Sequence, residues 1–402
     1  MAGKKNFNTG VRGEMYKLLL TYGMVTYDGL EMLHQHEKRI YQRGIKKMQR
    51  ENLVNVKWMK GGRRKYAILN NREIKNEKDM YDEATFKSQY EAVGRDNSHN
   101  TSDSRNFRVE KVYRGAKIYQ MMYGAGINCM PTDKLKLLPA WKTTRDTEYT
   151  LRDMLAYYGD AEIKDAAEYK ADIGIGTKRG DRILFNTRAH GVMCNENRVY
   201  IVYNTENQLM IWTNTAEQKF IYSAREVIAH TYGVEINDKP CGIVIGATME
   251  MSERILTQPV IVTADKTYIS ANNPFDHLYS IPYNQYGQKM LELMQNSFWE
   301  QALKDKYLKG LSQLTVSSGV DCDGVDKENR QYVLLYAIPD INKLYRFLAN
   351  ASMREDREHF EIICYEWEQA FIEKVTEKRY KITVLTNAEF FEDIEKIGYG
   401  AV

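Results

Sequence analysis

The chain has 402 residues, of which 43% are hydrophobic and 28% charged, a composition typical of soluble globular proteins. This length predicts two or three domains rather than one small core. No apolar run approaches the roughly 20 residues that a membrane-spanning helix needs, and residues 1–10 are polar and basic. We therefore expect neither a membrane span nor a signal peptide, and a cytoplasmic protein without a membrane partner.

The five cysteines do not form a recognisable pairing or metal-binding pattern. Their number is odd, they lie far apart, and none are spaced as Cys-x-x-Cys. This argues against a disulfide framework and a zinc ribbon, and predicts reduced residues of the core. They are Cys129, Cys194, Cys241, Cys322 and Cys364.

Positive charge is concentrated at the N-terminus. Residues 1–70 contain 15 Lys and Arg against 5 Asp and Glu, a net charge of +10, whereas the whole chain carries only +3. The other 332 residues therefore carry −7. A compact, strongly basic fold favours a polyphosphate partner, because neutralised phosphates release condensed counterions. A basic face that only solubilises the domain is the alternative.

The same stretch predicts three short helices. Gly23 is placed to end the first helix, and Thr26 to cap a second helix that carries Leu30 and Leu33. The third helix is expected over residues 36–50. The inward apolar positions are Met15, Leu18, Leu19 and Tyr22 in the first helix, and Ile40, Ile45 and Met48 in the third.

Two predicted strands follow the helices. Residues 53–58 and 65–69 are extended runs, and the turn between them contains two glycines. Three helices followed by a hairpin with a basic tip are typical of a winged helix-turn-helix. We therefore predict a double-stranded DNA-binding domain over residues 1–70, with a winged helix that contacts proteins as the alternative.

The outward positions of the third helix are cationic or polar, as in a recognition helix. Arg39, Gln42 and Arg43 are long enough to reach base edges in the major groove, and the later lysines suit phosphate. Basic residues of the hairpin suit the flanking minor groove or the backbone. The predicted DNA-binding residues are Lys38, Arg39, Gln42, Arg43, Lys46, Lys47, Arg50, Lys60, Arg63, Arg64 and Lys65.

The rest of the chain predicts a polar linker and a larger domain. Residues 71–105 have little to bury, although 71–92 suit an exposed helix. Helical spacing resumes at Val109 and opens a second domain over 106–402, for which we expect an α+β (mixed α/β) fold with a mixed sheet. Three strands over 182–185, 199–203 and 209–212 suggest an antiparallel meander.

Further elements are expected down to the C-terminus. The alternation of strands and helices near the end suggests a partly parallel sheet. Strands are predicted over 242–246, 260–269, 332–338, 360–364 and 380–385, and helices over 217–232, 341–351, 367–375 and 388–397.

Motifs for enzyme chemistry are weak. There is no phosphate-binding P-loop, GxGxxG, HExxH or GxSxG. Glu-x-Lys, which holds Mg²⁺ and orients water in restriction-type nucleases, occurs at 73–75, 162–164, 168–170 and 217–219, none of them within a convincing strand. No metal site or cofactor is predicted, and Mg²⁺ enters only under a nuclease alternative. No catalytic residue is assigned.

Three polar clusters each allow a structural and a functional interpretation. Asp321, Asp323 and Asp326, with Glu328 beyond, surround a glycine and suit a divalent cation or, more simply, a solvated turn. His34-Gln35-His36 lies at a helix junction, unlike the paired histidines of relaxases, which lie on a strand. Residues 188–191, Arg-Ala-His-Gly, are interpreted as a structural loop, with anion binding as the alternative.

The chain resembles the replication-relaxation family, whose members are encoded on plasmids and integrative conjugative elements of Gram-positive bacteria. The features that carry this resemblance are the predicted winged helix, the polar linker and the stretches 188–191 and 200–205. The resemblance implies a DNA-binding protein of a mobile genetic element, acting in replication, relaxation or transfer, with a nuclease-like second domain. The chain departs from that pattern because it lacks a clear acidic residue paired with Glu-x-Lys.

Three functions follow as hypotheses. The first is a sequence-directed DNA-binding protein whose larger domain forms a homodimer, binds a partner or remodels DNA. The second is a metal-dependent nicking nuclease that uses carboxylates of the larger domain. The third is a transcriptional regulator whose larger domain senses a small ligand.

Overall fold

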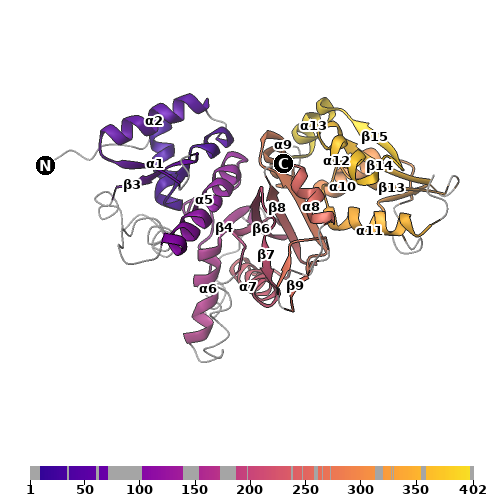
Figure 1. The fold of residues 1–402 in the computed structure, drawn as a ribbon, viewed down its shortest axis with the longest axis horizontal. Coiled ribbons are helices and arrows are strands. Elements are labelled where there is room, and N and C mark those ends of the chain that lie inside the picture. The colour runs from indigo at the N-terminus through magenta and orange to yellow at the C-terminus, as the bar shows by residue number, and fades with distance from the viewer. Residues whose placement is uncertain are drawn as a thin grey trace. The chain divides into compact units, whose positions relative to one another are not determined.

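The protein is α+β, as the sequence predicted, with helices and mixed sheets along the chain (Figure 1). The structure is a computed structural model that describes residues 10–33, 36–59, 63–70, 102–138, 154–172, 187–196, 198–236, 239–246, 248–257, 261–264, 266–271, 273–312, 320–326, 328, 330–354 and 359–398. No helix among these residues is long and apolar enough to span a membrane.

The helices alternate with the strands over most of the chain. They are α1 (Gly10–Tyr22), η1 (Asp28–Met32, 3₁₀), α2 (Lys38–Arg50), α5 (Ser102–Gly124), α6 (Asp160–Asp172), α7 (Asn214–Tyr232), α8 (Glu250–Thr257), α9 (Gln285–Leu293), α10 (Trp299–Tyr307), α11 (Ile341–Ser352), α12 (Glu366–Thr376), α13 (Asn387–Asp393) and η5 (Ile394–Gly398, π).

The strands form separate sheets. They are β1 (Val25–Thr26), β2 (Val54–Trp58), β3 (Lys65–Leu69), β4 (Ala156–Gly159), β5 (Gly191–Cys194), β6 (Val199–Glu206), β7 (Ile211–Thr213), β8 (Cys241–Gly246), β9 (Ile261–Thr263), β10 (Lys266–Tyr268), β11 (His277–Pro282), β12 (Gly324–Asp326), β13 (Gln331–Leu335), β14 (Phe360–Tyr365) and β15 (Lys381–Leu385).

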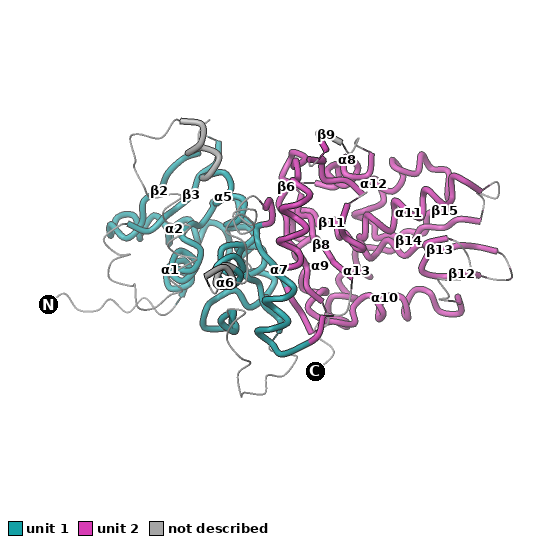
Figure 2. The backbone as a smooth tube through the Cα atoms, turned by 90° about the horizontal axis from the view of Figure 1, so that it is seen from below, with its two compact units in different colours: residues 1–181, 190–193, 223–234 teal, residues 182–189, 194–222, 235–402 magenta. Residues whose placement is uncertain are grey.

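The chain divides into two compact units, coloured separately in Figure 2. Unit 1 comprises residues 1–181, 190–193 and 223–234, and unit 2 comprises residues 182–189, 194–222 and 235–402. This division does not follow the expected boundaries at 70 and 106, because α5 packs on the elements of the first seventy residues.

The N-terminal elements of unit 1 follow the predicted order with one change. Helix α1 ends at Gly23, whose φ of 80° suits glycine and whose N–H donates to the Leu19 carbonyl. The second helix was predicted too long: Thr26 belongs to strand β1, and only the 3₁₀ turn η1 follows it. Leu30 and Leu33 are nevertheless buried as expected.

Helix α2 and the hairpin were predicted well. The helix begins at Lys38, two residues later than expected, and Ile45 and Met48 are buried. The prediction for Ile40 was wrong, since its side chain is 39% exposed and Tyr41 is buried in its place. Strands β2 and β3 pair in an antiparallel hairpin, and β3 also pairs with β1.

Helix α5 covers one face of this three-stranded sheet. Strand alternation puts Thr26 and Tyr66 on that face, where Tyr66 meets the ring of Tyr113 from α5. The buried carboxamide of Gln120 accepts hydrogen bonds from the Thr26 N–H at 2.8 Å and hydroxyl at 2.7 Å, and donates to the Thr26 carbonyl at 3.2 Å. Gly29 permits this approach, because a Cβ there would lie 2.5 Å from the Gln120 Oε1.

The last residues of the expected linker belong to helix α5. Residues 71–101 lie outside the described residues, and residues 102–105 begin α5. The helix that the sequence predicted from Val109 is therefore real and longer at its N-terminal end. Unit 1 is completed by β4, α6, the neighbouring strand β5 and the end of α7.

In unit 2 the predicted antiparallel meander is wrong. Strand β6 pairs in parallel with β8, which pairs in parallel with β11, while β7 joins β10 and β9 in another sheet. Residues 182–185 lie outside the described residues. Parallel partners are separated by helices, so neighbouring runs in the sequence gave no evidence of this pairing.

The partly parallel sheet near the C-terminus is confirmed. Its order is β12-β13-β14-β15, with β13, β14 and β15 parallel. Side chains of α11 and α12, including Phe347 and Ile372, pack with Ile362 of β14 in one buried cluster. All five cysteines are buried and free, as predicted.

The hydrogen bonds between Gln120 and the backbone of Thr26 lead to a prediction about stability. Replacing Gln120 by Leu leaves the buried N–H and carbonyl of Thr26 without partners, which costs about 1–3 kcal/mol for each orphaned group. We expect a lower midpoint of urea unfolding by circular dichroism. The control is Gln218→Leu, at an exposed position of α7. Equal midpoints for the two variants would contradict this account.

Candidate nucleic-acid interface

Helix α2 has one face fixed in the core. Tyr41, Ile45 and Met48 are fully buried, and Gly44 lets α1 approach, since a Cβ there would lie 3.1 Å from a methyl carbon of Val11. The Tyr41 hydroxyl donates to the buried carboxylate of Glu14 at 3.3 Å. This packing determines which side of α2 faces away from the core.

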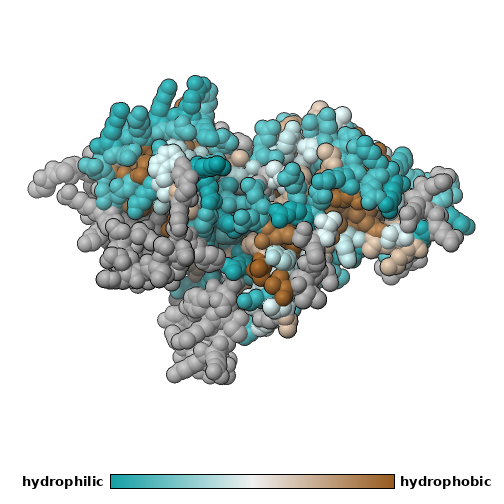
Figure 3. All heavy atoms as spheres, in the orientation of Figure 1, coloured by the Kyte–Doolittle hydropathy of each residue, from teal (hydrophilic) through white to brown (hydrophobic). Residues whose placement is uncertain are grey.

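The opposite side of α2 is cationic and exposed. Lys38 and Gln42 are half-buried, and the other predicted positions of the helix are exposed. Figure 3 shows hydrophilic atoms where α2 lies in Figure 1. The cations that make no hydrogen bond or ion pair with another described residue are Arg43, Lys46, Lys47 and Arg50.

Two cations at the start of α2 have carboxylate partners. Lys38 pairs with Glu31, and Arg39 lies 3.4 Å from Glu37 with both side chains at least 70% exposed. Exposed pairs of this kind contribute little stability. Arg39 can therefore exchange its carboxylate for another acceptor at little cost.

The hairpin divides its basic residues between two environments. Arg63 is exposed, whereas Arg64 forms a bidentate pair with Glu110 of α5 and lies 5.3 Å from the centre of the Tyr113 ring. The Lys65 ammonium lies over the Tyr27 ring. Lys60 lies outside the described residues. Arg64 thus has a partner within the protein that the sequence did not indicate, because Glu110 is 46 residues away.

Sequence reasoning missed Trp58. Its side chain is 58% exposed at the end of β2, beside the cations of the hairpin. The sequence placed Trp58 only in an extended run and indicated no role for it. The signal available in the sequence was an aromatic residue among basic residues.

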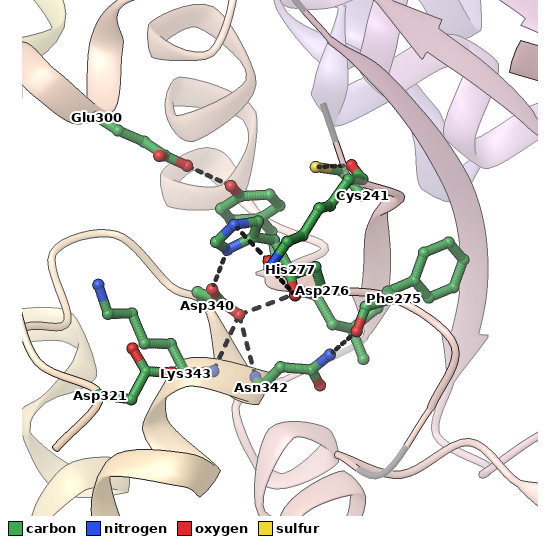
Figure 4. Close-up of polar contacts among 12 residues, drawn as sticks. Cys241, Phe275, Asp276, His277, Glu300, Asp321, Asp340, Asn342 and Lys343 are labelled. Carbon is green, nitrogen blue, oxygen red and sulfur yellow. Dashed lines mark hydrogen bonds and ion pairs between the residues drawn. The ribbon is translucent and has the colours of Figure 1, made fainter. Parts of the chain in front are cut away.

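Unit 2 contains a polar cluster at one end of β11, shown in Figure 4. His277 Nδ1 lies 2.7 Å from Asp340 and its Nε2 lies 3.2 Å from Asp276. Asp340 also caps α11, accepting from the N–H groups of Asn342 and Lys343. The cluster joins β11 to the segment between β13 and α11.

The pKa of His277 is raised above its usual value. Burial alone would lower it, but the hydrogen bond and charge of Asp340, together with Glu300 and Asp276, outweigh burial. Glu300 is in turn paired with Arg198 at 2.6 Å. The cluster is a set of satisfied charges within unit 2.

The acidic cluster and the Glu-x-Lys motifs do not form a metal-binding arrangement in the part of the chain that the structure describes. Asp323 is buried between Lys304 and Lys343, and Asp321 pairs with Arg346. Glu-x-Lys at 162–164 and 168–170 lies on α6 and at 217–219 on α7, and 73–75 lies outside the described residues. Among the described residues no three His, Cys, Asp or Glu are grouped to hold a metal ion.

The two histidine-containing motifs also have structural surroundings. His190 is buried, and burial, followed by the charge of Lys111, lowers its pKa to about 3, so it is neutral. Its carbonyl accepts from the Tyr157 hydroxyl at 3.0 Å. His34 and Gln35 lie outside the described residues, and His36 is exposed just before α2.

The raised pKa of His277 predicts a pH effect on unit 2. A protonated histidine with a raised folded-state pKa stabilises the fold fully below the unfolded value of about 6.5, and this contribution is lost as pH rises through the folded-state pKa. We expect the free energy of unfolding to fall over this interval in the natural protein but less in His277→Gln, measured by urea unfolding. His359→Gln is the control; an unchanged pH slope in His277→Gln would count against it.

Comparison of the chain with protein-family models, with curated proteins and with solved structures returned no match. The function of the protein is therefore inferred from its own residues, their contacts and their charges. Of the two polar regions described, the α2 residues Arg43, Lys46, Lys47 and Arg50 are exposed and make no ion pair with another described residue. The charges around His277, in contrast, are paired with one another within unit 2.

Proposed function

We propose that the protein binds double-stranded DNA through the exposed face of α2. The observation that carries this proposal is the row Arg43, Lys46, Lys47 and Arg50, which make no hydrogen bond or ion pair with other described residues while the opposite side of the helix is buried. A helix anchored on one side and cationic on the other fits the major groove, about 12 Å wide.

The positions along α2 suggest a division of roles. Arg39, Gln42 and Arg43 lie in the first half of the helix, the half that contacts base edges in helix-turn-helix proteins. Lys47 and Arg50 lie in the last turn, where they suit phosphates on either side of the groove. Their contacts supply affinity, and those of the first half supply sequence preference.

The hairpin supplies a smaller share of the interface than the sequence suggested. Arg63 is exposed and suits a phosphate beside the helix-bound groove. Arg64 is retained by Glu110 and Tyr113, and serves instead to attach the hairpin to α5. We therefore omit Arg64 from the DNA-contacting set.

The biological setting rests on the family resemblance. It supports a protein of a mobile genetic element that acts on its DNA during replication, relaxation or transfer. Under this proposal, unit 1 selects the DNA site and unit 2 provides the partner or assembly function.

Charge removal on α2 tests the proposal. We expect Lys47→Ala/Arg50→Ala to weaken binding to a mixed-sequence duplex and to reduce the slope of log affinity against log salt by about two, because each lost phosphate contact removes ~0.9. Fluorescence anisotropy over a salt series measures both. Lys219→Ala/Lys309→Ala, which removes the same charge from exposed positions of unit 2, is the matched control. Identical slopes for both double variants would refute the interface.

Two neighbouring arginines allow a second comparison. Arg63→Ala is expected to reduce the salt slope by about one, whereas Arg64→Ala leaves the slope unchanged and lowers the unfolding midpoint of unit 1, because it removes the pair with Glu110. The same anisotropy series and urea unfolding distinguish them. A loss of slope in Arg64→Ala equal to that in Arg63→Ala would place Arg64 on the DNA.

A further inference from the structure

Trp58 is a large aromatic side chain that the fold does not bury. It is 58% exposed, compared with 39% for Ile40, the other large hydrophobic side chain of the N-terminal elements that is notably exposed among the described residues. A single exposed apolar residue is ordinary on a protein surface. Trp58 differs because its surroundings are cationic and because its position is held by a specific contact.

The strand register shows which way Trp58 faces. Trp58 pairs with Lys65, and Val56 pairs with Ala67, which is fully buried. Alternation therefore puts Trp58 and Lys65 on the face opposite to Tyr66 and α5. This is the face that packs against α1 and α2, so Trp58 extends the side of the sheet that carries the DNA-binding helix.

Lys65 connects Trp58 to the body of unit 1. Its ammonium lies 5.2 Å from the centre of the Trp58 ring and 4.7 Å from that of Tyr27. Cation–π contacts of this kind orient an aromatic ring and also leave a positive charge beside it. Tyr27, Lys65 and Trp58, hereafter the wing stack, thus present an oriented and largely exposed indole next to an ammonium group.

An aromatic face with adjacent positive charge matches the two parts of a nucleotide. The ammonium of Lys65 and the guanidinium of Arg63 suit phosphates, and the indole suits a base. Within a duplex both faces of each internal base are covered by neighbouring bases, so away from the duplex ends an indole stacks most readily on an unpaired base. Base–aromatic stacking contributes ~1–3 kcal/mol per base and does not require a particular sequence.

We infer that the preferred DNA of this protein is a duplex with an unpaired strand at its flank, and that Trp58 stacks on a base at that junction. This inference rests on the proposed function, since α2 holds the duplex part. The charge complementarity of the wing stack and of Arg63 with a polyanion favours nucleic acid over a protein partner at this surface.

The test compares two DNA probes with the same duplex. One probe is blunt, and the other has a single-stranded extension with the fluorescent base 2-aminopurine at its first unpaired position. We expect the 402-residue protein to bind the extended probe about five-fold or more tightly, the lower end of the stacking free energy, and to quench the 2-aminopurine. Trp58→Ala is expected to lose the preference and the quenching, and Trp58→Phe to retain both in part.

A matched control removes another exposed aromatic. Tyr222→Ala, at a position 69% exposed on α7, is expected to leave the preference unchanged. Circular dichroism and the salt slope on the blunt probe show whether Trp58→Ala keeps the fold and the α2 interface. The loss of junction preference in a variant with a normal salt slope is the result that supports the inference.

Two kinds of failure are distinguishable. If the natural protein binds neither probe, the proposed DNA-binding function itself is wrong. If it binds both probes equally, or if Trp58→Ala weakens both by the same factor, α2 still binds DNA but Trp58 does not recognise an unpaired base. Weakening of both probes by the same factor would assign Trp58 to a groove of the duplex.

Discussion

The arrangement of unit 1 depends on the pairing of Gln120 with the backbone of Thr26. Strand β1 is the edge of its sheet, and its outward N–H and carbonyl at Thr26 would otherwise be buried without partners. One carboxamide satisfies both groups and brings α5 onto the sheet. The sheet is then covered on both faces, by α1 and α2 on one side and by α5 on the other, so α2 is held on a sheet that is itself part of a larger core.

Local patterns in the sequence predicted the elements that local interactions determine. Periodicity placed α2 within two residues, and the paired glycines indicated the hairpin between β2 and β3. The prediction for Ile40 was wrong because the neighbouring Tyr41 provides the buried contact. The second helix was predicted wrongly because Thr26 pairs with β3 as part of strand β1.

Contacts between distant residues could not be predicted in this way. The pairing of Arg64 with Glu110 and the parallel partners of β6 and β8 depend on segments that are tens of residues apart. The exposed cations of the predicted interface were found because charge at helical spacing is a local pattern. Trp58 was missed because the sequence of a strand alone does not tell which of its large side chains stays exposed.

The alternation along β3 has a consequence for how the chain can vary. Arg64 and Lys65 are neighbours, yet one pairs toward α5 and the other lies over Tyr27 on the opposite side. Inserting or deleting one residue within the strand would exchange these sides along its whole length, exposing the surface that α5 now covers. Related chains should therefore conserve the number of residues in this strand.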